Sequence, residues 1–389
     1  MSEKTINKVP NVPTLRFREH TDEWHKFALS DFVTRITRRN KNNESSLPLT
    51  ISAQYGLVDQ ITFFNKTVAS VDLSGYYLLY NGDFAYNKSY SNDYAWGAVK
   101  RLDRYDKGCL SSLYFVFRPT DKVNSDYLTH YFETSKWHKG ISDIAGEGAR
   151  NHGLLNIAVE DYFATQHYLP SLPEQKKIAN FLNLITKRIE VQNKIINKLE
   201  SLICTLRSTI FNSYNWEWNR LDTYIKSGII TLKRGNVIPK HDEDSEFKFP
   251  VYSSSIHNNG LMGYNNSYMF DKELITWSVD GGGNFFYRPK HKFNVTNVCG
   301  IMEITDNSYN YRFLSEILLA QHSRLIFDYQ TKAHPSVIEK LYKIPNVDIK
   351  IQEKIAYIFE LYYTKLQKEK DILSLYKKQK AYLLQNMFI

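Results

Sequence analysis

The stretch LPSLPEQKKIANFL, residues 169–182, returns in altered form as IPNVDIKIQEKIAYIF, residues 344–359. Aligning Ile178 with Ile355 gives an offset of 177 residues, which holds without a gap from Ile178 to Phe211. Before this point the second copy departs from the first, with two inserted residues and no Pro-Glu pair. A repeat of this size predicts an architecture built from two like halves.

Apolar residues in both copies recur alternately four and three residues apart, the heptad pattern of helices that pack lengthwise. The seam of the first copy comprises Ile178, Leu182, Ile185, Ile189, Gln192, Ile196 and Leu199. The seam of the second copy comprises Ile355, Phe359, Tyr362, Leu366, Glu369, Leu373 and Tyr376. Gln192 and Glu369 are polar at matching positions, and a polar seam residue commonly fixes register at a cost in stability.

Each predicted helix is about 40 residues, or about 60 Å, long. One small domain is too narrow to cover such a length, so the pattern predicts that the two helices pair with each other. In the alternative, each helix packs only on its own globular neighbour.

The segments between the helices echo each other faintly. WHKFAL (24–29) resembles WEWNRL (216–221), whereas residues 44–110 and 235–300 alternate Tyr, Phe, Val and Ile with Gly and Asn turns. That alternation is typical of irregular β structure. The sequence therefore predicts an α+β chain, with two pseudo-symmetric domains joined by two long helices. The expected boundaries are 1–168 for the first domain, 169–212 for the central helix, 213–345 for the second domain and 346–389 for the C-terminal helix.

Composition narrows the class of protein. The chain has 389 residues, enough for more than one domain, and a formal net charge of +9, which points to a polyanionic partner. Cys109, Cys204 and Cys299 lie far apart, which argues against a disulfide framework or a zinc cluster and suits a reducing cytoplasm. No segment has the roughly 18 apolar residues of a membrane span, and the N-terminus lacks an apolar signal-peptide core. We expect a cytoplasmic protein with no membrane partner.

Motifs for catalysis are missing from the sequence. It contains no G-x-x-x-x-G-K-[ST] phosphate loop, no NPPF or DPPY tetrapeptide of a DNA amino-methyltransferase, and no H-E-x-x-H or C-x-x-C metal pattern. Three adjacent glycines, 281–283, lack the G-x-G-x-x-G spacing and are typical of a tight turn. We therefore expect no catalytic residue, cofactor or metal site in this chain.

Polar and basic loops recur within both domains, and so do the loops GARNH and TKAH that precede the two helices. Asn can pair with adenine, Arg or Lys with guanine, and a hydroxyl with either base. The divergence of these loops between like helices indicates that the two domains have different targets, while the helices offer equivalent surfaces to two copies of one partner. Taken singly, each loop is also compatible with a solvated turn, and His152 and His334 with a general base. The candidate DNA-contacting residues are Arg35, Arg38, Arg39, Lys88, Tyr90, Arg150, Asn151, His152, Lys233, Arg234, Ser254, His257, Asn258, Lys332 and His334.

These features together resemble the specificity subunit of type I restriction–modification systems. The resemblance rests on LPSLPEQKKIANFLNLITKRIEVQNKIINKLESL from Leu169 and its weaker echo from Ile344. It also rests on the openings WHKFAL and WEWNRL, and on FPVYSSSIHNNGLMGY with ELITWSVDG in the second domain. It spans essentially the whole chain.

The resemblance implies that each domain is a target recognition domain reading one half of a split site in double-stranded DNA. It implies an antiparallel coiled coil that sets the distance between the halves. The implied partners are two methyltransferase subunits, which methylate adenine, and two motor–nuclease subunits. S-adenosylmethionine, ATP and magnesium would belong to those partners, and this chain would be non-catalytic. The alternatives are a methyltransferase or nuclease with its own site, and a coiled-coil structural protein without a DNA function.

Overall fold

The computed structural model describes residues 11–66, 69–70, 72–90, 94–146, 153–238, 248–255, 257–280, 282, 284–325 and 332–389. The chain forms two units, the first made of Met1–Gln192 with Leu373–Ile389 and the second of Asn193–Ile372. The division falls inside both long helices, so each unit combines one domain with part of each helix. The four-part division at residues 168, 212 and 345 stays a prediction.

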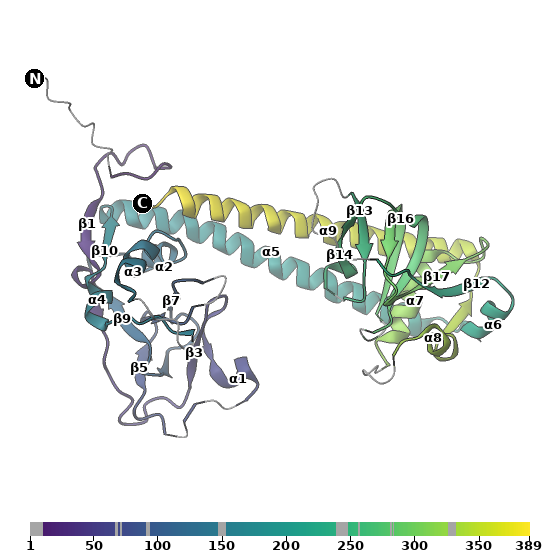
Figure 1. Cartoon of the computed structure of the whole chain (residues 1–389), viewed down its shortest axis with the longest axis horizontal. Coiled ribbons are helices and arrows are strands. Elements are labelled where there is room, and N and C mark those ends of the chain that lie inside the picture. The colour runs from purple at the N-terminus through teal and green to yellow at the C-terminus, as the bar shows by residue number, and fades with distance from the viewer. Residues whose placement is uncertain are drawn as a thin grey trace, which may run out of the picture. The chain divides into compact units, whose positions relative to one another are not determined.

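The first unit contains an antiparallel four-stranded sheet in the order β2-β9-β6-β7 and three two-stranded ribbons, β1-β10, β3-β4 and β5-β8. Figure 1 labels β1, β3, β5, β7, β9 and β10 of this unit. The strands are β1 (His25–Ala28), β2 (Val33–Arg35), β3 (Leu49–Ser52), β4 (Gly56–Asp59), β5 (Tyr77–Tyr80), β6 (Phe84–Asn87), β7 (Ala98–Arg101), β8 (Lys107–Leu110), β9 (Phe115–Pro119) and β10 (Gln166–Leu169). The short helices are η1 (Leu29–Asp31), α1 (Gln60–Phe64), α2 (Ser125–Tyr131), α3 (His138–Ile144) and α4 (Val159–Ala164). The irregular β structure expected for residues 44–110 is confirmed.

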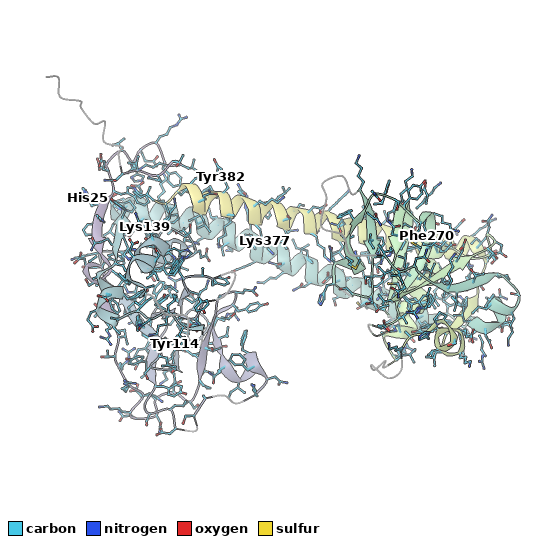
Figure 2. The ribbon with its side chains drawn as sticks, in the orientation of Figure 1. His25, Tyr114, Lys139, Phe270, Lys377 and Tyr382 are labelled. Carbon is cyan, nitrogen blue, oxygen red and sulfur yellow. The ribbon has the colours of Figure 1, made fainter. Side chains whose placement is uncertain are left out.

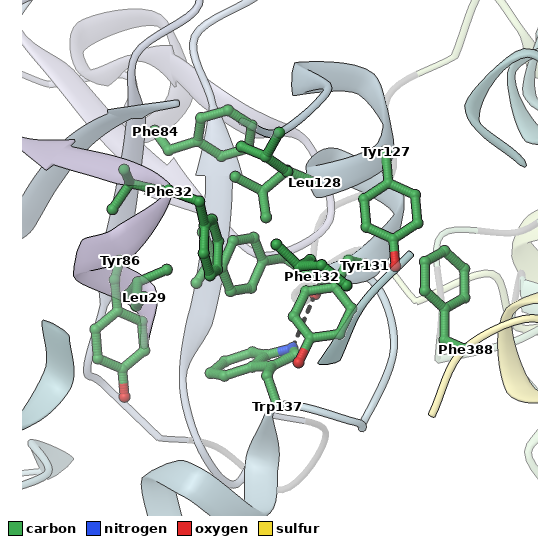
Figure 3. Packing of buried hydrophobic residues seen from close by; sticks show 14 of the residues in the cluster. Leu29, Phe32, Phe84, Tyr86, Tyr127, Leu128, Tyr131, Phe132, Trp137 and Phe388 are labelled. Carbon is green, nitrogen blue, oxygen red and sulfur yellow. Dashed lines mark hydrogen bonds between the residues drawn. The ribbon is translucent and has the colours of Figure 1, made fainter. Parts of the chain in front are cut away.

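The core of the first unit is largely aromatic. The Tyr86 and Tyr162 rings stack with centroids 4.6 Å apart. The ring centroid of Phe388, near the end of the chain, lies 5.3 Å from that of Tyr127 and 6.0 Å from that of Tyr131. Figure 3 draws these three rings. All five rings are almost completely buried. The residues that follow the second long helix, which ends at Asn386, therefore supply part of the core of the first domain.

The second unit contains a more regular sheet than the sequence predicted, with six strands in the order β12-β17-β15-β16-β13-β14. Its pairings are antiparallel except that of β13 with β16. The strands are β11 (Glu217–Arg220), β12 (Ile230–Arg234), β13 (Phe249–Tyr252), β14 (Leu261–Asn265), β15 (Phe270–Ser278), β16 (Phe285–Val295), β17 (Cys299–Ile304) and β18 (Lys343–Asn346). The helices are α6 (Leu221–Lys226), η3 (His257–Gly260), α7 (Tyr311–His322) and α8 (Pro335–Leu341).

Each domain has a two-stranded ribbon in which its first strand pairs with its last. β1, from WHKFAL, pairs with β10, the strand just before the first long helix. β11, from WEWNRL, pairs in the same way with β18, just before the second. The faint echo between the two domain openings is thus a real structural equivalence.

The long helices are α5 (Leu172–Ser213, 42 residues) and α9 (Ile349–Asn386, 38 residues). Their first residues are 177 positions apart, the same offset as between Ile178 and Ile355. The two-residue insertion inferred from the sequence is therefore wrong. The insertion was inferred because Leu169-Pro170 and Ile344-Pro345 look alike in sequence. The strands at these places, β10 and β18, nevertheless begin 177 positions apart, as the long helices do.

A buried glutamine near the start of each long helix makes the same hydrogen bonds in both units. Gln175 Oε1 accepts from the backbone N–H of Asn124 (2.8 Å), and its Nε2 donates to the Pro170 carbonyl (2.9 Å). Gln352 Oε1 accepts from the backbone N–H of Asn310 (2.9 Å), and its Nε2 donates to the Val347 carbonyl (2.8 Å).

The two asparagines in these pairs are helix N-caps. Asn124 caps α2, and Asn310 caps α7. The repeated motif therefore attaches each long helix to the N-terminus of a helix in its own domain.

All predicted members of the heptad seam are buried or half-buried. In the second unit, Glu200 of α5 pairs with Lys370 of α9 at 2.7 Å, and Arg207 bonds the Tyr363 hydroxyl at 2.9 Å. Seven residues forward on α5 thus correspond to seven residues back on α9, which makes the helices antiparallel. Gln192 and Glu369 are each only 6% exposed.

We expect Gln352→Met to lower the free energy of unfolding of the second unit by about 3 kcal/mol, because it leaves buried backbone groups without partners. Urea unfolding measures the change. The matched control is Gln367→Met on the exposed face of α9, where a shift within about 0.5 kcal/mol is expected. Equal midpoints for the two variants would contradict the role assigned to Gln352.

Candidate nucleic-acid interface

The strand ends of the second domain gather around the turn at residues 296–299. The Thr296 N–H donates to the Tyr252 carbonyl at the end of β13 (2.9 Å). The Val279 N–H, just after β15, donates to the Val298 carbonyl (3.0 Å). Segments far apart in the sequence therefore meet at one end of the six-stranded sheet.

Several candidate residues lie at this sheet end. Arg234, the last residue of β12, donates from Nε to the Asn297 carbonyl (2.7 Å). Lys332 forms an ion pair of 3.0 Å with Asp280, the residue after Val279. His334 follows closely and is half-buried at the N-cap of α8. Arg234 and Lys332 are exposed and so could contact a polyanion.

The loop after β13 carries three more candidates, Ser254, His257 and Asn258. Asn258 (φ 48°) has the left-handed backbone conformation that Asn tolerates better than most residues. The Ser253 N–H donates to the Gly260 carbonyl (2.7 Å) and closes the loop. His257 and Asn258 are exposed, and Ser254 is half-exposed. The loop thus presents an imidazole and an amide to solvent on a constrained backbone.

Arg288 of β16 packs beside the residues at the two ends of this loop, Tyr252 and Gly260. Its side chain is buried, its guanidinium lies 3.6 Å from the centroid of the Tyr252 ring, and its Nε donates to Thr276 Oγ1 (3.0 Å). A Cβ atom added to Gly260 would lie 3.3 Å from the Arg288 Nη2, so the guanidinium touches the loop backbone. Burial lowers the pKa of Arg288 to about 10, and the group stays charged at neutral pH.

Lys233 is engaged within the sheet. Its Nζ lies 3.1 Å from Glu303 on the neighbouring strand, and Lys272 binds the same carboxylate. Burial alone would raise the pKa of Glu303, but hydrogen bonds from Lys272 and Lys233 outweigh it and hold that pKa below its ordinary value. One carboxylate therefore partly neutralises both lysines.

In the first domain, Arg38 belongs to an ion-pair cluster around Asp83. This fully buried carboxylate accepts from Arg38 (3.0 Å) and from Arg118 Nε (2.6 Å). Its Oδ2 also accepts from the Tyr80 N–H (2.8 Å). The two arginine side chains remain 35% and 43% exposed, so they are held in place and still face solvent.

The other candidates of the first domain are more scattered. Arg35 lies 3.8 Å from Glu160, and Arg39 stacks on Tyr77 at 4.5 Å. The Tyr90 N–H bonds the Gly153 carbonyl (3.0 Å) and the Lys88 carbonyl accepts from Leu155 (2.9 Å), so this loop pairs with the segment that follows residue 152. Arg150, Asn151 and His152 lie outside the described residues.

Sequence reasoning missed Arg118 and Arg288. Arg118 lies in β9 and Arg288 in β16, so neither stands in one of the polar loops. Their roles arise from Asp83 and Tyr252, which are distant in sequence, so no local pattern marks them.

Within the described part of the chain, no group of three or more His, Cys, Asp or Glu could hold a metal ion. Among those residues no helix has the length and apolar character needed to cross a membrane.

We expect Arg288→Met to speed hydrogen exchange of the Ser253 amide about tenfold, because stacking on Tyr252 and a hydrogen bond are lost together. The Thr305 amide, which bonds the Ile229 carbonyl away from the loop, serves as the internal control and should not change. Equal acceleration of both amides would indicate general destabilisation.

Comparison with known proteins gives a consistent result. Residues 223–375 match the family described as "Type I restriction modification DNA specificity domain". The chain is 34% identical over 149 residues to a putative type I specificity subunit N-terminus of Mycoplasma pneumoniae, which covers 37% of this chain and 78% of that relative. A second putative type I specificity subunit of that organism is 30% identical over 146 residues, with 36% of this chain and 39% of the relative covered.

Among solved structures, the type I restriction–modification S subunit of M. genitalium superposes with a TM-score of 0.61 at 19% identity. The match covers 97% of this chain and 99% of that chain, which shows a shared fold. On the evidence of sequence and fold together, this chain belongs to the family of type I restriction–modification specificity subunits.

Proposed function

We propose that this chain selects the DNA sequence acted on by a type I restriction–modification complex, with each domain reading one half of a split site. The observation that carries this proposal is the gathering of Arg234, Lys332 and the His257–Asn258 loop at one end of the second domain's sheet. Cations suited to phosphates lie there beside an amide and an imidazole suited to base edges.

The partner assignment rests on the outer faces of the long helices. Leu184 and Leu361 are equivalent in the repeat and are 61% and 52% exposed, and Ile195 and Ile372 are equivalent and 39% and 37% exposed. Exposed apolar residues at repeated positions suit two copies of one partner. We propose that these faces bind two methyltransferase subunits and that two motor–nuclease subunits join the same complex. S-adenosylmethionine, ATP and magnesium belong to those partners, and this chain is non-catalytic.

The rival proposal is a stand-alone methyltransferase or nuclease. Incubating the purified chain with labelled S-adenosylmethionine and DNA should give no turnover, whereas adding the methyltransferase partner should give methylation at a split site. Turnover by the chain alone would overturn the non-catalytic assignment. A coiled-coil structural protein, in contrast, would show no salt-dependent binding to DNA.

We expect loss of the Asn258 amide to cost roughly 1–3 kcal/mol of discrimination at one position of one half-site. Asn258 has φ 48°, so Asn258→Ala removes the amide and also strains the backbone. Asn258→Gly removes the amide and keeps the left-handed conformation available. Methylome sequencing of cells carrying each variant with its methyltransferase measures the outcome.

Asn258→Gly and Asn258→Ala should relax the same position if base contact is the cause. If only Asn258→Ala has an effect, then loop shape is what matters. Relaxation in the half-site read by the first domain would contradict the assignment of one domain to one half.

A further inference from the structure

A cleft of about 580 Å³ lies in the first unit where β7 and the α2–α3 connection meet both long helices. Lys100 of β7 and Lys377 and Lys380 of α9 line it. Lys377, which is labelled in Figure 2, is exposed. These lysines were not among the candidates identified from the sequence.

The second unit has a cleft of about 670 Å³ at the equivalent place in the repeat. The 177-residue offset maps every long-helix residue that lines the first cleft onto a residue that lines the second. For example, Ile189, Lys377 and Ala381 correspond to Leu366, Glu200 and Cys204. The two clefts are therefore a matched pair, and their charges can be compared directly.

Cations in the second cleft are largely neutralised by carboxylates. Arg207 pairs with Glu316 at 2.8 Å, and Lys370 pairs with Glu200 at 2.7 Å. Arg312, also in this cleft, pairs with Glu360 at 2.7 Å. Arg288 also lines this cleft and has no ion pair within the described residues, but it is buried against Tyr252, so little charge is left for a ligand.

The first cleft has a surplus of positive charge. Lys380 pairs with Glu133 at 2.8 Å, but within the described residues no carboxylate forms an ion pair with Lys100 or Lys377. Lys377 also stands where the second cleft has the carboxylate of Glu200. The cleft thus holds three lysines and one glutamate.

Lys100 is the most constrained of these lysines. It is half-buried, and burial lowers its pKa; Glu133 opposes this effect and the charge on Lys380 adds to it. A bound anion would offset both the lost solvation and the repulsion from Lys380. The position and charge of Lys100 therefore favour the binding of an anion in this cleft.

The residues that line the cleft indicate which kind of anion it could bind. Phe132, Trp137 and Tyr94 line it together with the lysines, but Phe132 and Trp137 are buried in the core, so the half-exposed Tyr94 supplies the aromatic ring that a ligand can reach. An aromatic ring beside ammonium groups suits a flat ring attached to a phosphate, since bases stack on aromatic side chains and lysine binds phosphate as a point charge. A nucleotide unit has both parts.

We propose that the cleft lined by Lys100, Lys377 and Lys380 binds the phosphate of a nucleotide unit. The nucleotide is either part of the DNA backbone or free in solution. The DNA version rests on the proposed function, and the free-nucleotide version does not. The equivalent cleft of the second unit does not share this role, because Arg207, Arg312 and Lys370 form ion pairs within it and Arg288 is buried against Tyr252.

The test compares Lys100→Gln and Lys377→Gln with Lys370→Gln, a control one heptad earlier on α9 in the second cleft. Duplex DNA carrying the target site is titrated at several salt concentrations, and adenosine monophosphate is titrated by calorimetry. Thermal unfolding checks that each variant is folded. Lys377 is exposed, so Lys377→Gln tests the site even if Lys100→Gln does not fold.

Two results would support the inference. A salt-dependence slope lowered by about one unit per lost lysine, for any DNA sequence, identifies a backbone phosphate as the ligand. Adenosine monophosphate binding that weakens at least tenfold in the two cleft variants identifies a free nucleotide. Lys370→Gln should match the parent protein in both titrations.

Two failures can be told apart. If the parent protein binds DNA, the cleft variants keep its slope and adenosine monophosphate does not bind, then the inference is wrong and the proposed function stands. If the parent protein binds adenosine monophosphate through these lysines but no DNA, the proposed function is wrong and the inference stands. If neither ligand binds the parent protein, both are wrong.

Discussion

One buried glutamine near the start of each long helix is the contact on which the arrangement of each unit depends. It satisfies the N–H of a helix-capping asparagine in the domain and a carbonyl of the strand-to-helix link, so helix, domain and ribbon are fixed to one another. A glutamine is suited to this position because its amide offers a donor and an acceptor together. The repeated motif thus keeps the same helix-to-domain connection in both units, while the domain surfaces beyond it are free to differ.

The two domains hold their polar groups in different ways. In the first, a buried carboxylate, Asp83, fixes two partly exposed arginines. In the second, a buried cation, Arg288, supports a loop that presents His257 and Asn258. Both arrangements restrict side-chain or loop motion before a ligand arrives, which reduces the entropy cost of binding. A shared scaffold therefore supports two distinct surfaces.

Features repeated along the chain were predictable from the sequence, because a heptad seam leaves a periodic trace of apolar residues. The seam residues within 178–199 and 355–376 are buried or half-buried. The α+β architecture followed from the same repeat. The prediction of a two-residue insertion was wrong, because two similar Leu/Ile-Pro pairs were aligned with each other. Strand pairing sets a different register, which the sequence does not reveal. Arg118 and Arg288 could not be found, since their partners Asp83 and Tyr252 come close only through sheet formation. The DNA contacts of the candidate residues stay predictions, because base contact depends on side-chain reach in a complex.

Phe388 packs against both Tyr127 and Tyr131, and this has a consequence for synthesis on the ribosome. Residues 193–372 include all of the second unit, whereas the first unit needs residues from both ends of the sequence. At about 5–20 residues per second, the aromatic face of the first domain waits roughly ten seconds to a minute for Phe388 to be added. The domain made first therefore finishes folding last, and its nascent form exposes tyrosines that the finished protein covers.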